Sequence, residues 1–197
     1  MSERDPELWV VRHGETEWSR AGRHTGRTDV PLTPSGERQA LALRARLAGL
    51  RFAAVLSSPL SRALETCRLA GHGEAARIVG DLREWDYGEY EGRTTAEIQR
   101  DVPGWNIWSA GVPGGESVDE LGRRADRVIE EAAAARGDVL LFAHGHVLRV
   151  LAARWCGLAP RDGRLLALGT ASLGVLGHER GTRVVQRWNL PADAVGS

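Results

Sequence analysis

The chain has 197 residues, of which 42% are hydrophobic and 26% are charged, a composition that fits a folded protein and excludes a disordered one. Its 26 basic and 26 acidic side chains cancel, so no net field favours nucleic acid or an anionic membrane as a partner. All the basic residues are arginine, which excludes Schiff-base lysine chemistry and a P-loop lysine. Any phosphate must therefore be bound by arginine, histidine or backbone amides.

The length fits one domain of ordinary size, and we expect residues 1–197 to form a single domain. Cys67 and Cys156 lie far apart in apolar patterns, which favours reduced, buried thiols. The charged N-terminus does not resemble a signal peptide, and no segment is long and apolar enough to span a membrane. These features predict a cytoplasmic protein without a membrane anchor.

Short apolar runs alternate with segments of helical periodicity along the chain. Residues 8–11 predict a buried strand that ends near His13, and residues 14–34 predict a long irregular loop. The segment after this loop predicts a helix with Thr33 or Ser35 as its N-cap. The elements expected next are a strand at 52–56, a helix at 60–70, a short strand at 77–79 and a short helix at 94–102.

The same alternation continues in the second half of the chain. Ser117 is the expected N-cap of a long helix over 118–136, and the run VLLFAH predicts the most clearly buried strand. A further helix follows, and residues 165–189 suggest a closing hairpin. Strands that alternate with helices predict an α/β fold, with a mixed, mostly parallel central sheet flanked by helices in three layers.

Two of the expected strands end in the same unusual way, in VVRHGE and LFAHGH. Because ligand sites of open α/β sheets lie outside the carboxyl ends of the strands, His13 and His144 are expected at such a site. Arg62 begins the helix after the second strand, near a helix N-terminus that attracts anions. Together with Arg12, these side chains are expected to converge on one dianion, since a guanidinium binds two phosphate oxygens at once. The alternative for Arg62 is an ordinary helix-surface arginine.

Four segments together resemble the histidine phosphatase superfamily, in its phosphoglycerate mutase-like branch: RHGETEWS, SSPLSRALET, LREWDYGEYEG and FAHGH. The resemblance covers residues 8–157 well and the closing segment loosely. Within the branch, the chain is similar to sugar phosphatases of the sedoheptulose-1,7-bisphosphatase group and nearly as similar to actinobacterial broad-specificity acid phosphatases. The resemblance implies a phosphoglycerate mutase-like fold and a phosphomonoesterase that acts through a phosphohistidine, with no metal and no organic cofactor.

The resemblance also implies roles for individual residues. His13 would be the nucleophile, and Glu84 in LREW would be the general acid that protonates the leaving alkoxide. Trp85 and other aromatic residues flank Glu84, where they either desolvate it or simply pack in the core; we expect an acidic to near-neutral pH optimum. The residues expected to bind the phosphoryl oxygens are Arg12, Arg62 and His144. Further substrate-binding candidates are Ser19, Thr25 for its hydroxyl, Gly26 for its amide, and His146, which contacts the ligand or packs beneath the loop.

The expected partner is a small-molecule phosphate ester, with sugar phosphates and bisphosphates favoured. Mutases of the family carry an inserted basic segment before the second His-Gly, whereas the corresponding region here is short and has only Arg93 and Arg100 as cations. Mutase activity is therefore not expected. The sequence leaves open the physiological substrate, whether Arg93 or Arg100 holds a second phosphate, and the oligomeric state, for which a homodimer is common among single-domain enzymes.

Three alternatives compete with this function. His144 and His146 have a spacing seen among metal ligands, but no further His or Cys cluster accompanies them, as a zinc site requires. A non-catalytic phosphate-binding domain of the same fold would usually have lost the nucleophile or the acid, and both are present. Phosphohistidine-protein phosphatases tend to be shorter and to lack the aromatic segment REWDYGEYEG.

Overall fold

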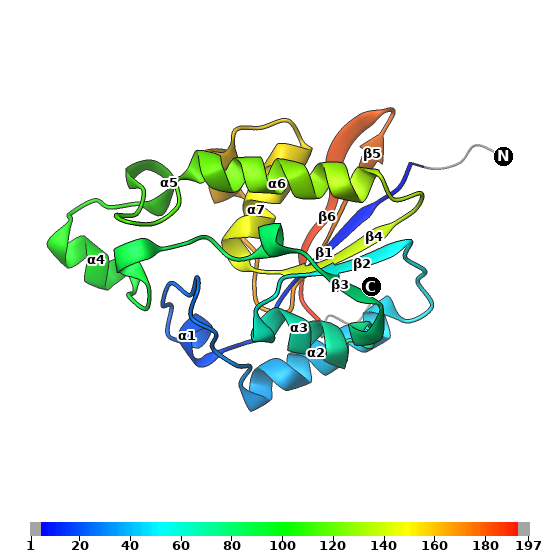
Figure 1. Ribbon diagram of the computed structural model, residues 1–197, viewed down its shortest axis with the longest axis horizontal. Helices are drawn as coiled ribbons and strands as arrows, with labels where there is room; N and C mark the ends of the chain where they lie inside the picture. Colours follow the sequence, from blue (N-terminus) through cyan, green and yellow to red (C-terminus); the bar gives the residue numbers. More distant parts are fainter. Residues whose placement is uncertain (1–4, 193–197) are drawn as a thin grey trace.

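A central sheet of six strands organises the chain in the computed structural model, which describes residues 5–192. The strands lie in the order β3-β2-β4-β1-β5-β6 (Figure 1). The first four pair in parallel, and β5 and β6 add antiparallel pairs at one side. This sheet confirms the predicted mixed, mostly parallel fold. The strand bounds are β1 Leu8–Arg12, β2 Ala54–Ser57, β3 Ala76–Ile78, β4 Val139–Ala143, β5 Leu173–Glu179 and β6 Thr182–Leu190.

Helices cover both faces of the sheet (Figure 1). One face carries α2 (Pro34–Leu47) and α3 (Ser61–Leu69), and the other carries α6 (Val118–Ala133) and α7 (Gly145–Trp155). The short helices α1, α4 and α5 lie beyond the end of the sheet toward which β1 runs. The bounds of these and of the 3₁₀ helices are α1 Glu17–Arg20, α4 Thr95–Asp101, α5 Ile107–Ala110, η1 Gly73–Ala75, η2 Gly80–Leu82, η3 Gly88–Tyr90 and η4 Pro160–Leu165.

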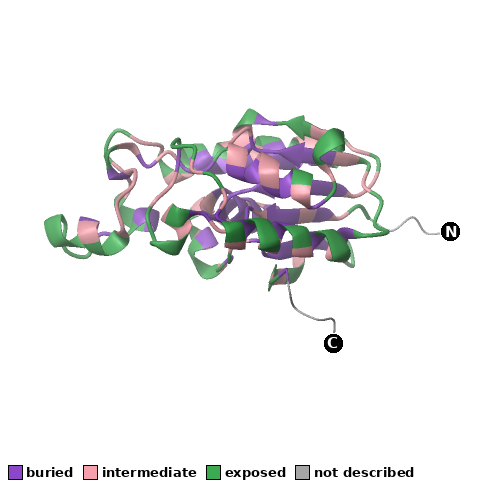
Figure 2. Cartoon of the chain, turned by 90° about the horizontal axis from the view of Figure 1, so that it is seen from below, coloured by how far each residue is buried: buried purple, intermediate pink, exposed green. Residues whose placement is uncertain are grey.

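Alternate side chains of the central strands enter two separate apolar cores. Val10 and Leu141 belong to the core on the α6–α7 face, whereas Val11 and Phe142 belong to the core under α2 and α3. Successive side chains of a strand point to opposite faces, so a strand that is covered on both sides is apolar throughout. This is why β4 is buried at every position and forms a continuous apolar run in the sequence. Figure 2 shows the central strands in the colour of buried residues.

Capping side chains set several helix starts. Thr33 accepts a hydrogen bond from the Gly36 amide at the start of α2, and Ser117 forms a capping box with Glu120 at the start of α6, so both predicted caps are confirmed. The segment 14–34 differs from the prediction, because a capping box between Thr16 and Ser19 starts the helix α1 inside the expected loop.

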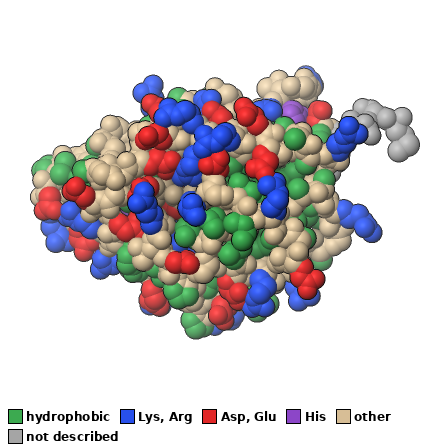
Figure 3. Space-filling model, viewed as in Figure 1, with side chains coloured by type: hydrophobic (Ala, Val, Ile, Leu, Met, Phe, Trp, Pro, Cys, Tyr) green, Lys and Arg blue, Asp and Glu red, His purple; other side chains and the backbone are tan. Residues whose placement is uncertain are grey.

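Acidic and basic side chains are interspersed on the face seen in Figure 3, in keeping with the zero net charge of the sequence. Among the helices of the described residues, none combines the length and the apolar character that crossing a membrane requires.

Candidate active site

The two His-Gly segments meet because β1 and β4 are parallel neighbours. Arg12 lies opposite Ala143 in the register of the two strands, and the amide of His13 donates to the Ala143 carbonyl at 3.0 Å. His144 directly follows β4, and the centroid of its ring lies 5.2 Å from the ring centroid of His13. The prediction that His13 and His144 lie close together is therefore confirmed.

The imidazole of His13 is buried and uncharged. Its Nδ1 lies 2.7 Å from the Gly14 carbonyl oxygen, and because that oxygen can only accept, Nδ1 carries the proton. The lone pair is therefore on Nε2. Burial lowers the pKa of His13 well below its ordinary value of 6.5, and the charges of Arg12 and Arg62 lower it further. An uncharged imidazole with a free Nε2 is the form that attacks an electrophile.

Arg62 is fully buried, which excludes the alternative of a helix-surface arginine. Its Nε donates to Nδ1 of His144 at 3.1 Å, so the neutral His144 ring carries its proton on Nε2, 2.7 Å from the hydroxyl of Ser58. Burial, followed by the charge of Arg62, lowers the pKa of His144 well below 6.5. The other Arg62 donors bind the carbonyl oxygens of Thr25, Gly26 and Thr28.

Arg12 holds one of the few unsatisfied donors of the described residues. Its Nη1 donates to the Leu168 carbonyl at 2.6 Å, but its Nε is buried with no hydrogen-bond partner. The guanidinium also lines the cavity described below, where its charge favours an anionic ligand. A Cβ on Gly145 would lie 3.3 Å from the Arg12 guanidinium, so the main chain after His144 passes close to this side chain.

A cavity of about 200 Å³ opens beside these side chains. Gly26, Arg62 and His144 do not belong to its lining, and the last two lie one layer deeper, fully buried. The sequence-predicted residues that line it are Arg12, His13, Ser19, Thr25, Glu84 and His146.

Gly26 corrects one expectation. Its amide donates to both carboxylate oxygens of Glu91, at 2.9 and 3.0 Å, so this N–H is not offered to a ligand as predicted. The hydroxyls of Ser19 and Thr25 donate to carbonyl oxygens of their own loop, of Thr16 and Arg23. Ser19 and Thr25 thus line the cavity, but their hydroxyl protons are already used in hydrogen bonds within the loop.

The side chain of Glu84 reaches the N-terminus of α7 from the segment between η2 and η3. Its buried carboxylate accepts hydrogen bonds from the amides of Trp85, His146 and Val147, at 2.9, 3.0 and 2.9 Å. These donors and the positive end of the helix fix the position of the group within the cavity wall. Of the flanking aromatic residues, Trp85 and Tyr87 both belong to the apolar core, so the expected core packing is confirmed, and Tyr87 also lines the cavity.

His146 contacts the cavity and also packs against aromatic rings. Its Nδ1 lies 2.6 Å from the Tyr87 hydroxyl, and its ring packs against Trp108 at 5.2 Å between centroids. His24 lines the cavity too, with its ring 4.8 Å from that of Tyr87, and burial lowers its pKa to about 4. Sequence reasoning missed His24, because a histidine inside an irregular loop carries no periodic signal.

Arg149 is a second cavity residue that sequence reasoning missed, although its i, i+3 spacing from His146 on α7 was an available signal. Its guanidinium lies 4.7 Å over the ring of Trp108. In contrast, Arg93 pairs with Asp101, and neither Arg93 nor Arg100 lines the cavity.

His144 and His146 form hydrogen bonds with different residues. His144 bonds with Arg62 and Ser58, and His146 bonds with Tyr87. Within residues 5–192, no three or more His, Cys, Asp or Glu side chains gather into a group that could hold a metal ion.

Comparison with known proteins gives a consistent result. The model of the histidine phosphatase superfamily, branch 1, matches residues 8–191. An acid phosphatase of Mycobacterium tuberculosis is 43% identical over 93% of this chain and 92% of its own. The sedoheptulose 1,7-bisphosphatase of Saccharomyces cerevisiae is 37% identical over 78% of this chain and 68% of its own.

Solved structures share the fold. The structure of a mycobacterial glucosyl-3-phosphoglycerate phosphatase complexed with VO3 superposes with a TM-score of 0.83 at 30% identity, over 95% of this chain and all of that one. The structure of an open reading frame of Mycobacterium tuberculosis reaches a TM-score of 0.90 at 41% identity, over 96% of this chain and all of that one. The chain therefore belongs to branch 1 of the histidine phosphatase superfamily and is a phosphatase of that family.

Proposed function

We propose that the protein hydrolyses small phosphorylated metabolites, with sugar phosphates and bisphosphates as its substrate class, through a phosphohistidine on Nε2 of His13. The observation that carries the proposal is the uncharged His13, with its lone pair on Nε2, in a cavity wall that it shares with Arg12 and Glu84. The relatives named acid phosphatase and sedoheptulose 1,7-bisphosphatase support the substrate class.

The reaction proceeds in two in-line steps. Nε2 of His13 attacks phosphorus, the bond from phosphorus to the leaving oxygen breaks, and Glu84 gives that oxygen a proton. Water then attacks the phosphohistidine while Glu84 takes a proton from it, and the electron pair of the broken P–N bond returns to Nε2. The guanidinium of Arg12, which lines the cavity, binds a phosphoryl oxygen and offsets the charge that spreads over the phosphoryl group. Arg62 supplies a buried positive charge beside the group, and its hydrogen bond to the neutral ring of His144 fixes the orientation of that ring.

Arg149 supports substrates with a second anionic group. Its Nε and Nη2 donate to the carbonyl oxygens of Gly163 and Arg164, both at 3.1 Å, rather than to a carboxylate. Among residues 5–192 no carboxylate pairs with this half-buried guanidinium in the cavity wall, which favours an anionic substrate group beside it. Arg149→Met is expected to raise KM for fructose 1,6-bisphosphate by at least tenfold and to leave KM for p-nitrophenyl phosphate unchanged. Equal KM values of the wild type and of Arg149→Met for fructose 1,6-bisphosphate would contradict this assignment.

The phosphohistidine is tested by rapid acid-free quenching of the enzyme with a ³²P-labelled ester in EDTA. The wild type is expected to retain label that is stable in alkali and lost in acid, whereas His13→Ala is expected to retain none and to lose turnover. His72→Ala, a histidine outside the cavity, serves as the matched control. Label or turnover in a folded His13→Ala variant would refute the proposal.

The acid role of Glu84 is tested by its leaving-group dependence. Glu84→Gln keeps the shape of the side chain but has no proton to give, so we expect kcat/KM for glycerol 2-phosphate to fall about 10²-fold or more. The loss on p-nitrophenyl phosphate is expected to be much smaller, because p-nitrophenolate leaves without protonation. Equal losses on both esters would remove Glu84 from this role.

We also propose a cytoplasmic location. Cys67 and Cys156 are free thiols, which supports a reducing compartment. Fractionation of the native cells is the direct test.

A further inference from the structure

Glu84 lies on a segment without regular secondary structure. It follows η2 and precedes η3, and no strand or helix of the sheet layers contains it. A proton donor in such a segment keeps its position only if other groups hold the backbone on both sides of it. The three amides described above hold the carboxylate, so the remaining question is what holds the main chain.

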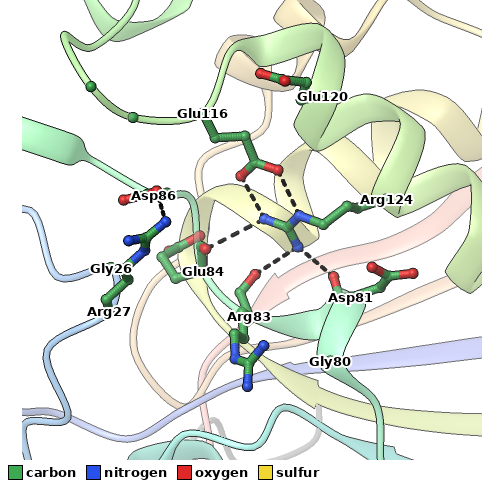
Figure 4. A pocket seen from close by; sticks show the side chains of 12 residues that line it. Gly26, Arg27, Gly80, Asp81, Arg83, Glu84, Asp86, Glu116, Glu120 and Arg124 are labelled. Atoms are coloured by element: carbon green, nitrogen blue, oxygen red, sulfur yellow. Dashed lines mark hydrogen bonds and ion pairs between the residues drawn. The ribbon is translucent and has the colours of Figure 1, made fainter.

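Arg124 of α6 holds the main chain on the N-terminal side. Its Nη1 donates to the carbonyl oxygens of Asp81 and, at 3.0 Å, of Arg83, and its Nη2 donates to the Glu84 carbonyl at 3.4 Å (Figure 4). The opposite edge of the guanidinium, Nε and Nη2, forms two hydrogen bonds of 2.7 Å with the carboxylate of Glu116. All the N–H groups of Arg124 are therefore used.

The main chain of Glu116 contacts the C-terminal side. Its carbonyl oxygen accepts from the indole Nε1 of Trp85 at 2.7 Å, and its amide donates to the Asp86 carbonyl at 3.0 Å. The neighbouring Gly115 lies so close that a Cβ there would be 2.4 Å from the Asp86 oxygen. The pair of Arg124 and Glu116 thus contacts the chain on both sides of Glu84.

The pair acts from outside the cavity that contains His13. Arg124 and Glu116 line a different cavity, of about 610 Å³, and Glu84 belongs to the lining of both. The side chains of Arg124 and Glu116 are only 15% and 14% exposed, so their ion pair is shielded from water and its geometry is fixed. Neither side chain belongs to the lining of the cavity proposed to take the substrate.

We infer that Arg124 and Glu116 are positioning residues for the proton transfer by Glu84. The inference rests on the acid role proposed for Glu84 under the proposed function. The planar guanidinium bridges one carboxylate and three carbonyl oxygens at once, which a lysine ammonium cannot do with the same geometry. Loss of the Arg124 side chain removes its three bonds to the main chain, and loss of the Glu116 carboxylate removes the group that orients Arg124. In either case the carboxyl group of Glu84 moves away from the leaving oxygen while His13 keeps its place after β1.

The experiment compares kcat/KM on glycerol 2-phosphate and on p-nitrophenyl phosphate, in EDTA. Arg124→Gln and Glu116→Gln are expected to lose about 10²-fold on the alkyl ester and less than tenfold on the aryl ester. A purely structural defect would lower both values by the same factor, since it removes active enzyme. Comparable losses on the two esters, or no loss, would overturn the inference, and Glu116→Gln decides the matter if Arg124→Gln does not fold.

Arg127→Gln is the matched control. Arg127 lies on the same helix, one turn further, and forms two hydrogen bonds of 2.8 Å with the Asp81 side chain, but its own side chain is 55% exposed. It contacts the same segment without reaching the Glu84 carbonyl. We expect Arg127→Gln to keep both kcat/KM values within twofold, because exposed ion pairs contribute little.

The double variant Arg124→Gln/Glu84→Gln separates this inference from the proposed function. If Arg124 acts through Glu84, the double variant is no slower on glycerol 2-phosphate than Glu84→Gln alone. Additive losses would overturn the positioning role while leaving the acid role intact. If Glu84→Gln itself shows no difference between the two esters, the acid role fails, and the inference fails with it.

Discussion

The chemistry of His13 depends on which ring nitrogen carries the proton and on how strongly the ring resists a second one. The Gly14 carbonyl fixes the proton on Nδ1, and burial together with the charges of Arg12 and Arg62 lowers the pKa well below 6.5. The ring therefore stays uncharged in mildly acidic solution. The acid limb of the pH profile is expected well below 6.5, which agrees with the acidic to near-neutral optimum that the sequence predicts.

Removal of a neighbouring charge tests this account. Arg12→Gln removes one of the cations that lower the pKa of His13, so that pKa rises and the acid limb of kcat/KM shifts to higher pH. Activity at the optimum is expected to fall about 10²-fold, because a phosphoryl-binding donor is lost. The pH profile on p-nitrophenyl phosphate measures both effects. Arg20→Gln, an exposed arginine of α1, is the control, and an unmoved acid limb in Arg12→Gln would contradict the role of the charge.

Single residues differ in how well the sequence predicts their placement. His13 and His144 were predictable because each follows an apolar strand, and parallel neighbours end at the same edge of a sheet. His24 was not, because its loop folds through contacts between distant segments, whereas Arg149 could have been found from its i, i+3 spacing to His146 on α7. Gly26 shows the same limit, since its amide is taken by Glu91, 65 residues away in the sequence.

At the scale of elements, the order of strands and helices followed from local patterns, and the exact boundaries did not. The cap of α6 was predicted because Ser117 and Glu120 form a local motif, whereas its end at Ala133, before the expected 136, depends on how the chain turns toward β4. Likewise, the expected strand at 52–56 is displaced to Ala54–Ser57, where its pairing with β4 begins. The boundaries therefore depend on tertiary contacts as well as on the local sequence.

A close approach between two elements holds the segment after His13 in place. A Cβ on Gly36, in the first turn of α2, would lie 2.1 Å from the Glu15 carbonyl oxygen, and a Cβ on Gly14 would lie 2.4 Å from the Gly36 oxygen. Both partners are backbone atoms, which cannot rotate away. The first turn of α2 thus packs directly on the main chain that leaves β1.

Gly36→Ala is therefore expected to destabilise the protein by about 1–3 kcal/mol, because the added methyl group forces the two backbones apart. Urea unfolding measures this loss, and the same displacement near His13 is expected to lower kcat on every ester. Gly80→Ala is the control, since its nearest contact would be an Arg83 side-chain atom at 3.8 Å. A Gly36→Ala variant as stable as Gly80→Ala would contradict the packing described here.

At the scale of the whole molecule, the uncharged histidines make stability depend on pH. Burial lowers the pKa values of His13, His144 and His146 well below 6.5 and that of His24 to about 4. Between these values and 6.5, the unfolded chain binds more protons than the folded one. Stability is therefore full above pH 6.5 and declines as the pH falls below it, by up to about 1.4 kcal/mol per pH unit for each such histidine.

Calorimetry from pH 7.5 to 4.5 is expected to show a Tm that falls steadily below pH 6.5. His24→Gln removes one titrating group and is expected to make the decline shallower. A Tm that is flat over this range would mean that these side chains already take up protons in the folded state.

The position of β1 in the sheet has a consequence for the order in which the molecule opens. β1 pairs with β4 on one side and with β5 on the other. In contrast, the segment that contains Glu84 is held mainly by hydrogen bonds from Arg124 of α6 and from Glu116 in the loop before α6. Elements with fewer main-chain pairs open at lower free energy than the centre of a sheet. On warming, the enzyme is thus expected to lose turnover of alkyl esters at a lower temperature than turnover of p-nitrophenyl phosphate, so that heat first removes the proton donor and only later the nucleophile.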